Sequence, residues 1–192
     1  SITQDDAHVF CRRSQFKAEA LVVWSIIEDF YGAAGFALSP RLSIHDPKQP
    51  KKYLGTEKSW QEAETTLREI VQEKKSNAIE AIGEAAFYGP KIDFMSKDSL
   101  GREWQLATIQ LDMNMPERFN LSCVNEEGKL ERIVMVHAAI MGAIERYIAI
   151  LIEHFAGAFP LWLSPVQIAV LSVTDTATTY AADITRELRT RG

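Results

Sequence analysis

Two of the four histidines lie in apolar, strand-like segments and are the residues best suited to hold a metal ion. His8 stands in the run HVF and His137 in the run MVHAA. Two imidazoles with one further ligand form a common zinc site that keeps a fourth position for substrate. The alternative is that each is a hydrogen-bonded structural histidine. His45 and His154 are expected in a loop and on a helix surface.

The segment around His8 is unusually polar. In a strand over residues 3–10, Gln4, Asp6 and His8 would share one face, because alternate residues of a strand point the same way. Burying these groups without partners would cost several kcal/mol. The pattern therefore indicates either a solvated edge strand or a face that binds a ligand.

Tyr88 stands directly before Gly89-Pro90, where the chain must change direction. A tyrosine at this position can present its hydroxyl to a cleft, or it can be an aromatic core residue beside a turn. Lys91 and Asp93 follow on one face of the next expected strand. They indicate either part of the same site or a surface ion pair.

Polar side chains interrupt the apolar run WQLATIQLDMN. By strict alternation Thr108 and Gln110 share a face, and Gln105 lies opposite them. A β-bulge would be needed to bring all three together.

Arg146 lies one helical turn after Gly142 in HAAIMGAIERYIAI. Small residues let a ligand approach a helix, and arginine is suited to bind phosphate. The alternative is that Glu145 and Arg146 form a surface charge pair.

Composition excludes several classes of protein. The chain has 192 residues, a net charge of −5 and 46% hydrophobic residues, which is typical of a globular domain and gives no bulk basic surface for non-specific nucleic-acid binding. Its two cysteines, Cys11 and Cys123, exclude a disulfide scaffold and fit a reducing, cytoplasmic location. Charged residues in the most apolar stretch argue against a membrane span.

Periodicity predicts an α+β fold with helices segregated from an antiparallel sheet. Helices are expected over 14–36, 56–75 and about 139–155, with Ser14 capping the first and Thr56 or Ser59 capping the second. Strands are expected over 3–10, 36–46 and 132–137, with a hairpin around the turn 97–102. Residues 164–192 read as a strand followed by a helix from about 176, the β–α start of an α/β domain.

The segments TQDDAHVF, GEAAFYGPKIDF, WQLATIQLDMNMPERF and VMVHAAIMGAIERYIAILIEHFAGAFPLWLSPVQ together resemble the catalytic core of the threonyl-tRNA synthetases, a family of class II aminoacyl-tRNA synthetases. The resemblance implies that residues 1–163 are a partial catalytic domain, from the end of motif 2 through motif 3. It also implies that residues 164–192 begin an anticodon-binding domain.

The resemblance implies a role for each candidate residue. His8 and His137 look like two zinc ligands, with a cysteine outside this sequence as the third. Asp6, Gln4 and Tyr88 resemble threonine-binding residues. Gln105 and Thr108 resemble ATP contacts, with Gln110 beside them, and Arg146 looks like the motif 3 arginine that steadies the ATP phosphates during catalysis.

The implied function is ATP-dependent ligation of threonine to its tRNA through a threonyl-adenylate, with zinc recognising the threonine amino and hydroxyl groups. Mg²⁺ with ATP, a homodimer and no membrane association are also expected. A non-catalytic synthetase-like binding module is the alternative, because Ile2 and Ala138 depart from the family pattern. A zinc hydrolase built on His8, His137 and Asp6 is a third reading. The resemblance implies that the 192 residues hold about half of a class II active site. As an isolated polypeptide the chain is therefore expected to bind zinc weakly and to show little aminoacylation.

Overall fold

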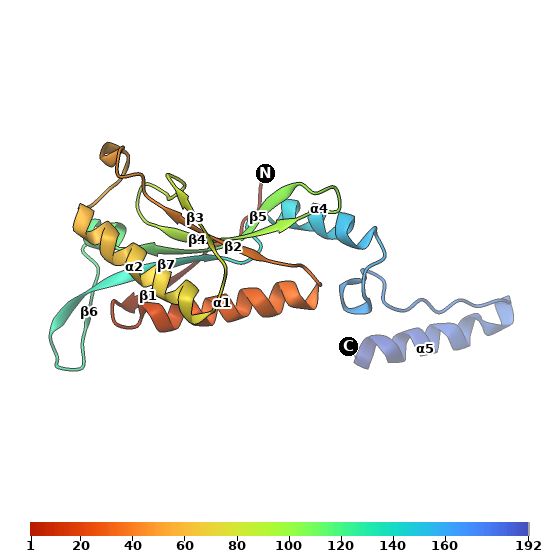
Figure 1. Cartoon of the computed structure of the whole chain (residues 1–192). Helices are drawn as coiled ribbons and strands as arrows, with labels where there is room; N and C mark the ends of the chain where they lie inside the picture. Colours follow the sequence, from red (N-terminus) through yellow and green to blue (C-terminus); the bar gives the residue numbers. More distant parts are fainter. Residues whose placement is uncertain (192) are drawn as a thin grey trace. The chain divides into compact units, whose positions relative to one another are not determined.

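The computed structural model describes residues 1–191, and seven strands in this range form one sheet (Figure 1). The strand order is β1-β7-β5-β4-β2-β3, with β6 paired to β7, and every pair is antiparallel except β2–β3. The strands are β1 (Ala7–Arg12), β2 (Ser39–Ile44), β3 (Ile79–Ile82), β4 (Lys91–Lys97), β5 (Glu103–Asp112), β6 (Ser122–Val124) and β7 (Leu130–Ala139). The predicted α+β class is confirmed.

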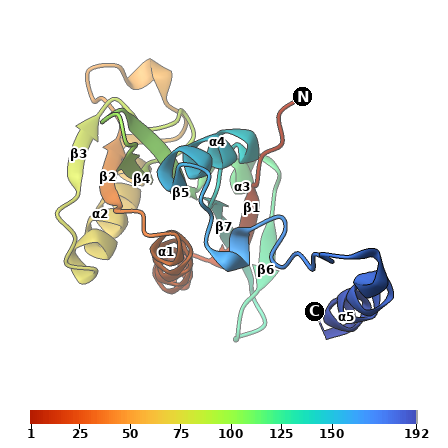
Figure 2. The same cartoon turned by 90° about the vertical axis from the view of Figure 1, so that its right-hand side faces the viewer.

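Two amphipathic helices, α1 (Phe16–Ala33) and α2 (Glu57–Glu73), pack on one face of this sheet (Figure 2). Their apolar residues recur at intervals of three and four, and each stripe is buried. In α1 the stripe includes Trp24, whose ring packs edge-on against Phe94 of β4. The core therefore lies between this face of the sheet and the helices α1 and α2. Neither of these two helices covers the opposite face.

Three further helices and three 3-10 turns complete the described chain. The helices are α3 (Asn114–Arg118), α4 (Ile144–Phe155) and α5 (Thr178–Arg191), and the turns are η1 (Pro50–Lys52), η2 (Leu161–Leu163) and η3 (Asp175–Ala177). Among the residues that the structure describes, no helix is both long enough and apolar enough to cross a membrane.

The helix starts confirm one predicted cap and correct another. The side chains of Thr56 and Ser59 form a reciprocal capping box on α2, as expected. Ser14 does not cap α1, because Gln15 occupies the cap position with helical backbone angles and no side-chain hydrogen bond. Helix α4 begins at Ile144, five residues later than predicted, because β7 continues to Ala139 and a tight turn follows it.

The predicted hairpin at 97–102 joins β4 to β5. Its strands contain the β-bulge that the sequence pattern required to bring Gln105 to the face of Thr108 and Gln110. Phe94 pairs with Ala107, but Met95 pairs with Gln105, so Leu106 is an extra residue in β5. This β-bulge reverses the alternation of side chains before Ala107, and it carries Gln105 to the same face as Thr108.

Residues 164–173 do not form the predicted strand. This segment carries no regular secondary structure, and Val166, Ile168, Leu171 and Val173 are exposed. A strand needs a hydrogen-bonded neighbour, and the described part of this unit offers none. The chain divides into two compact units, Ser1–His154 and Phe155–Gly192. A domain boundary at residues 163/164 stays a prediction.

His45 lies in the loop directly after β2, as predicted, but its side chain is buried. It is only 5% exposed, and its Nδ1 lies 2.6 Å from Oε1 of Glu64, itself buried on α2. The apolar rings of Tyr53 and Trp60 pack around its imidazole. His154 stacks on Phe36, with 4.3 Å between ring centroids.

Candidate functional site

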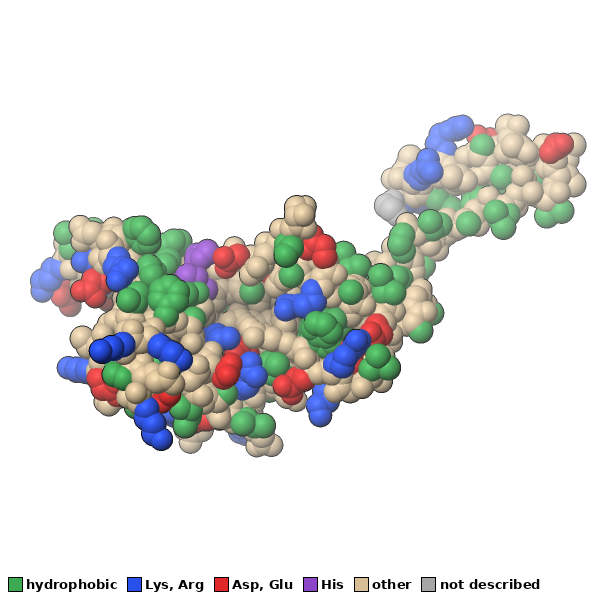
Figure 3. Space-filling view, turned by 90° about the horizontal axis from the view of Figure 1, so that it is seen from above, with side chains coloured by type: hydrophobic (Ala, Val, Ile, Leu, Met, Phe, Trp, Pro, Cys, Tyr) green, Lys and Arg blue, Asp and Glu red, His purple; other side chains and the backbone are tan. Residues whose placement is uncertain are grey.

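The sheet face opposite α1 and α2, here called the polar face, carries a row of polar side chains across five strands. Strand register places His8 opposite His137, His137 opposite Gln110, Gln110 opposite Lys91, and Lys91 opposite Ser43. Directly paired residues of antiparallel strands project to the same face. Residues separated by more than 120 positions therefore converge, and Figure 3 shows histidine side chains at the margin of a hollow in the molecular surface.

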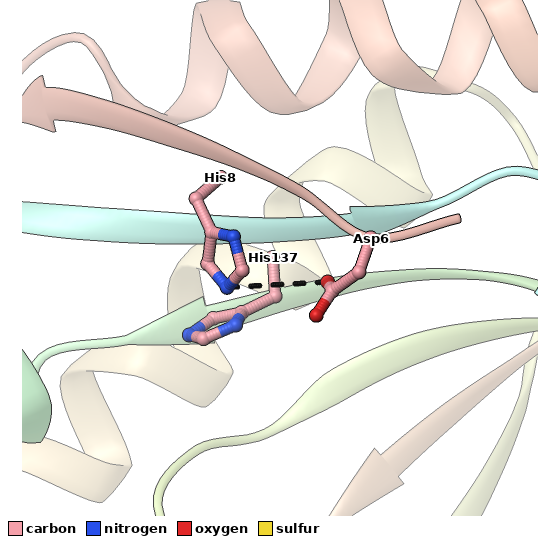
Figure 4. A group of neighbouring side chains, drawn as sticks. All are labelled: Asp6, His8 and His137. Carbon is pink, nitrogen blue, oxygen red and sulfur yellow. Dashed lines mark ion pairs between the residues drawn. The ribbon is translucent and has the colours of Figure 1, made fainter. Parts of the chain in front are cut away.

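The row begins with a group that can hold a metal ion. One ligand-capable atom from each of Asp6, His8 and His137 lies within 4.8 Å of the others (Figure 4). The two imidazole rings are 4.5 Å apart between centroids, and Nε2 of His8 lies 3.9 Å from Oδ1 of Asp6. Nitrogen ligands with a carboxylate nearby are the donor set that zinc prefers, so these residues fit that ion.

Asp112 fixes the orientation of His137. Its Oδ2 lies 3.0 Å from Nε2 of the imidazole, and the carboxylate is fully buried. An ionised carboxylate accepts only, so Nε2 carries the proton and Nδ1 keeps its lone pair. A buried carboxylate behind a histidine is the usual arrangement for holding a metal ligand in place.

Tyr88 leans against the same histidine, with 5.2 Å between ring centroids. Its hydroxyl donates to Oε1 of Gln110 at 2.8 Å, and Nε2 of Gln110 donates to the carbonyl of Gly89 at 3.0 Å. Burial, with the nearby carboxylates of Asp112 and Asp6, raises the pKa of the Tyr88 phenol, so the hydroxyl stays a neutral donor at pH 7.

The glycine after Tyr88 is required by a close approach of two chains. A Cβ built on Gly89 would lie 1.9 Å from the carbonyl oxygen of Leu111 in β5. The Leu111 amide donates to Pro90, which holds the two segments together. Only glycine fits here, and the resulting contact sets Tyr88 over the polar face.

A second row begins with Thr108 and is organised around Asp93, which is fully buried. Its Oδ1 accepts from Nε2 of Gln105 at 2.8 Å and from the Thr108 hydroxyl at 3.0 Å. Oδ2 accepts from Ser43 at 2.7 Å, and Nζ of Lys91 lies 2.8 Å away. Lys91 and Asp93 are therefore part of the polar face and do not form a surface pair.

Arg41 adds a second cation to this carboxylate. One of its guanidinium nitrogens lies 3.5 Å from Oδ2 of Asp93, and its Nε is buried without a hydrogen-bond partner within residues 1–191. Arg41 and Lys91 share one carboxylate, that of Asp93. Two cations against one anion give this group of three side chains a net positive charge.

Arg146 projects from the first turn of α4, and Gly142 makes room for it. A Cβ on Gly142 would lie 2.6 Å from a terminal nitrogen of this guanidinium, and the glycine has a φ of +63°. The Arg146 Nε is buried and unpaired among the described residues. Glu145 instead accepts from the backbone amide of Thr3, and no ion pair joins it to Arg146 within residues 1–191, so the alternative of a Glu145–Arg146 surface pair is wrong.

Gln4 does not join the histidines. Because β1 begins at Ala7, Gln4 lies outside the strand and pairs through an isolated bridge with Ala143, beside the start of α4. The structure thus groups Asp6, His8, His137 and Tyr88, and it groups Gln105 with Thr108, but it places Gln4 near Arg146.

Cys11 is unsuited to the metal. It is buried on the face that packs against α1, away from His8, and burial raises the pKa of its thiol to about 11. The thiol therefore stays protonated at pH 7.

Three residues of the site have roles that sequence reasoning did not assign, namely Gln110, Asp112 and Asp5. Alternation placed Gln110 on the face of Thr108 without indicating its contact with Tyr88, and one further step of two residues could have extended the polar face to Asp112. Asp5 gave no such signal, because its partners lie more than 130 residues away.

Residues 1–155 match the family described as the tRNA synthetase class II core domain (G, H, P, S and T), and the chain belongs to this family. Within it, the chain is similar to threonine–tRNA ligases over nearly its whole length, which confirms the resemblance seen in its motifs. The ligase of Porphyromonas gingivalis is 48% identical over 190 residues, 98% of this chain and 29% of its own. That of Chlorobium phaeobacteroides is 47% identical over 191 residues, 99% and 29% respectively.

Two solved structures share the fold. The RNA binding domain of threonyl-tRNA synthetase from Cryptosporidium parvum has a TM-score of 0.92 and 41% identity, covering 100% of this chain and 47% of its own. A protein from Aeropyrum pernix described as a threonyl-tRNA synthetase has a TM-score of 0.75 and 33% identity, covering 95% and 43%. The chain thus spans less than a third of the length of these curated ligases and about half of the solved chains.

Proposed function

We propose that this chain forms part of the active site of an enzyme that ligates threonine to its tRNA in an ATP-dependent reaction through a threonyl-adenylate. The observation that carries the proposal is the convergence of Asp6, His8 and His137 on one sheet face, in a chain 48% identical to threonine–tRNA ligases. The proposed location is the cytoplasm, and the proposed partners are tRNA, ATP, threonine and a second copy of the enzyme.

Threonine recognition falls to the first row of the polar face. His8 and His137 would hold a zinc ion, with a cysteine outside these residues as third ligand. Zinc would coordinate the amino and hydroxyl groups of the substrate. Valine lacks the hydroxyl, so coordination would reject it, whereas the shape of a pocket alone separates such isosteres by only about 10²-fold. Asp6 accepts the ammonium group, and the Tyr88–Gln110 pair presents a neutral hydroxyl to the amino acid.

ATP binding falls to Gln105, Thr108 and Arg146. Gln105 and Thr108 are held in fixed orientations by Asp93, so they can offer hydrogen bonds without reorganising. Arg146, whose Nε has no protein partner among residues 1–191, is suited to bind the phosphates that enter with Mg²⁺.

Catalysis on this arrangement depends on positioning and charge. The threonine carboxylate attacks the α-phosphate of ATP and pyrophosphate leaves. A hydroxyl of the terminal ribose of the tRNA then attacks the acyl carbonyl, and AMP leaves. The chain contributes by holding both reactants on one rigid face and by neutralising charge that moves onto pyrophosphate.

The test is threonine-dependent exchange of pyrophosphate into ATP by the intact protein that carries these residues, with serine and valine as competitors. We expect exchange with threonine that Asp6→Asn and Arg146→Gln each reduce by at least about a hundredfold, the usual scale for removing one transition-state contact. Lys129→Gln, on the exposed β6–β7 turn, is the control.

Absence of exchange in the zinc-loaded protein would contradict the proposal and favour the alternative, a synthetase-like module that binds without catalysis. Hydrolysis of an ester by the zinc-loaded protein in the absence of ATP would instead support the hydrolase reading.

A further inference from the structure

The loop between β2 and α2 is the most basic exposed segment beside the candidate site. Residues 46–56, here called the basic loop, contain Lys48, Lys51 and Lys52 and a single acid, Asp46. All three lysines are exposed, and none forms an ion pair within the described chain. A protein with a net charge of −5 thus carries three lysines within five residues of a loop that has one acid.

Local hydrogen bonds and a 3-10 turn shape the loop. Asp46 accepts from the Lys48 amide at 2.9 Å and from the Gln49 side chain at 2.6 Å, and η1 folds the next residues into a 3-10 turn. The Lys48 amide, the Gln49 side chain and the charges of Lys48 and Lys52 together hold the pKa of Asp46 below its usual range. The carboxylate is thus engaged in shaping the turn, and the lysine side chains remain available.

The loop is also attached to the site at its other end. Tyr53 packs against His45 and Trp60, and the Leu54 amide donates to the carbonyl of Phe87 at 2.7 Å. Phe87 directly precedes Tyr88. The basic loop therefore projects from the sheet next to the segment that carries the Tyr88 hydroxyl (Figures 1 and 2).

We propose that the basic loop binds the phosphate backbone of the tRNA close to its acceptor end. This rests on the proposed function, in which the terminal ribose of the tRNA must reach the threonyl group on the polar face. Nucleic acid that enters the site would pass beside Phe87 and Tyr88, where three lysines that form no ion pair among the described residues can neutralise its phosphates. Such contacts position the backbone and carry no base specificity.

The test is the salt dependence of tRNA binding by the intact protein, followed with a fluorescently labelled threonine tRNA transcript between about 50 and 200 mM salt. In the triple variant Lys48→Gln, Lys51→Gln, Lys52→Gln we expect the slope of log K against log salt to fall by about two to three, since each phosphate contact contributes roughly 0.7–0.9. The dissociation constant at the lower salt should rise by on the order of tenfold.

A second triple variant separates this local effect from bulk charge. Lys75, Lys97 and Lys129 are also exposed, lie away from the basic loop in the sequence, and give the same change in net charge when each is replaced by glutamine. We expect this control to leave the slope unchanged within about 0.5, less than one phosphate contact. An equal decrease of the salt-dependence slope in both triple variants, or an unchanged slope in both, would overturn the proposal.

Two further readouts complete the design. Vesicles of anionic lipid replace the tRNA in a parallel titration, and loop-dependent binding to vesicles without loop-dependent binding to tRNA would also overturn the proposal. Threonine-dependent pyrophosphate exchange, measured without tRNA, should be unchanged in the loop variant. Failure of exchange in the unmodified protein would count against the proposed function, whereas unaltered tRNA binding in the loop variant would count against the loop alone.

Discussion

Asp5 and Gly142 bind each other through two hydrogen bonds across 137 residues of sequence. The Asp5 amide donates to the Gly142 carbonyl at 3.1 Å, and the Gly142 amide donates to Oδ1 of Asp5 at 2.5 Å. Oδ2 of the same carboxylate accepts from the amides of Ile140 and Met141. One residue near the chain start thus shapes the turn between β7 and α4, from which Arg146 projects.

Asp5→Ala should therefore destabilise the protein and weaken ATP binding together. Three amides lose a charged acceptor, which predicts a loss of about 2–4 kcal/mol in the free energy of unfolding. Urea titration measures the stability, and equilibrium titration with ATP measures the affinity. Asp6→Ala is the matched control, because Asp6 is exposed and makes no backbone hydrogen bond in the described structure. It should lower threonine affinity and leave stability within about 0.5 kcal/mol.

Asp93→Asn tests the centre of the second row. The substitution keeps the shape of the side chain but leaves Lys91 and Arg41 without their buried counter-charge, so we expect a loss of about 2–4 kcal/mol. Ser43→Ala removes one neutral donor to the same carboxylate and should cost about 1 kcal/mol. Equal effects of the two substitutions, measured by urea titration, would show that the charge of Asp93 is unimportant.

Gly89→Ala and Gly32→Ala are the same substitution, but we expect the first to lower the free energy of unfolding and the second to raise it. At Gly89 the new methyl would collide with the Leu111 backbone, so β5 or Tyr88 must move and stability should fall by about 2 kcal/mol or more. At Gly32, on the exposed side of α1, nothing lies within 4 Å, and alanine should stabilise the helix by about 0.5–1 kcal/mol. Thermal unfolding followed by circular dichroism compares the two.

The turn of the β4–β5 hairpin should make stability depend on pH. Burial alone would raise the pKa of Asp98, but hydrogen bonds from the Trp104 indole and from Arg102 outweigh it and lower the pKa to about 2. A depressed pKa stabilises the fold above the unfolded value of about 3.9, and this contribution disappears as pH falls towards 2. The stability difference between the unmodified protein and Asp98→Asn should be constant above about pH 5 and shrink between pH 4 and 2. A difference that grows on acidification would contradict this.

Removal of either proposed zinc ligand should lower metal content and threonine affinity in parallel. We expect His8→Ala and His137→Ala each to weaken zinc binding by at least about a hundredfold, and Asp112→Asn, which only orients His137, by about 10–100-fold. Equilibrium dialysis with metal analysis measures the affinity. His154→Ala, outside the polar face, is the control. Unchanged zinc binding in both histidine variants would remove these residues as ligands.

Local chemistry determined much of this protein in advance. Apolar residues three and four apart specified α1 and α2, Thr56 and Ser59 specified the start of α2, and the turn 97–102 specified the β4–β5 hairpin. Each of these signals acts between neighbouring residues, so it can be read from the chain itself. The motifs around His8, Tyr88 and His137 likewise identified the family.

Tertiary structure decided what these residues touch. The bulge at Leu106 moved Gln105 to the polar face, strand register set His8 against His137, and Gly89 met Leu111 through a contact that no local pattern records. The strand predicted in residues 164–173 did not form. Apolar alternation forms a strand only where a neighbouring strand pairs with it through hydrogen bonds, and the described part of this unit offers none. Pairing between distant segments, rather than residue type, therefore placed Asp6 and His8 beside His137.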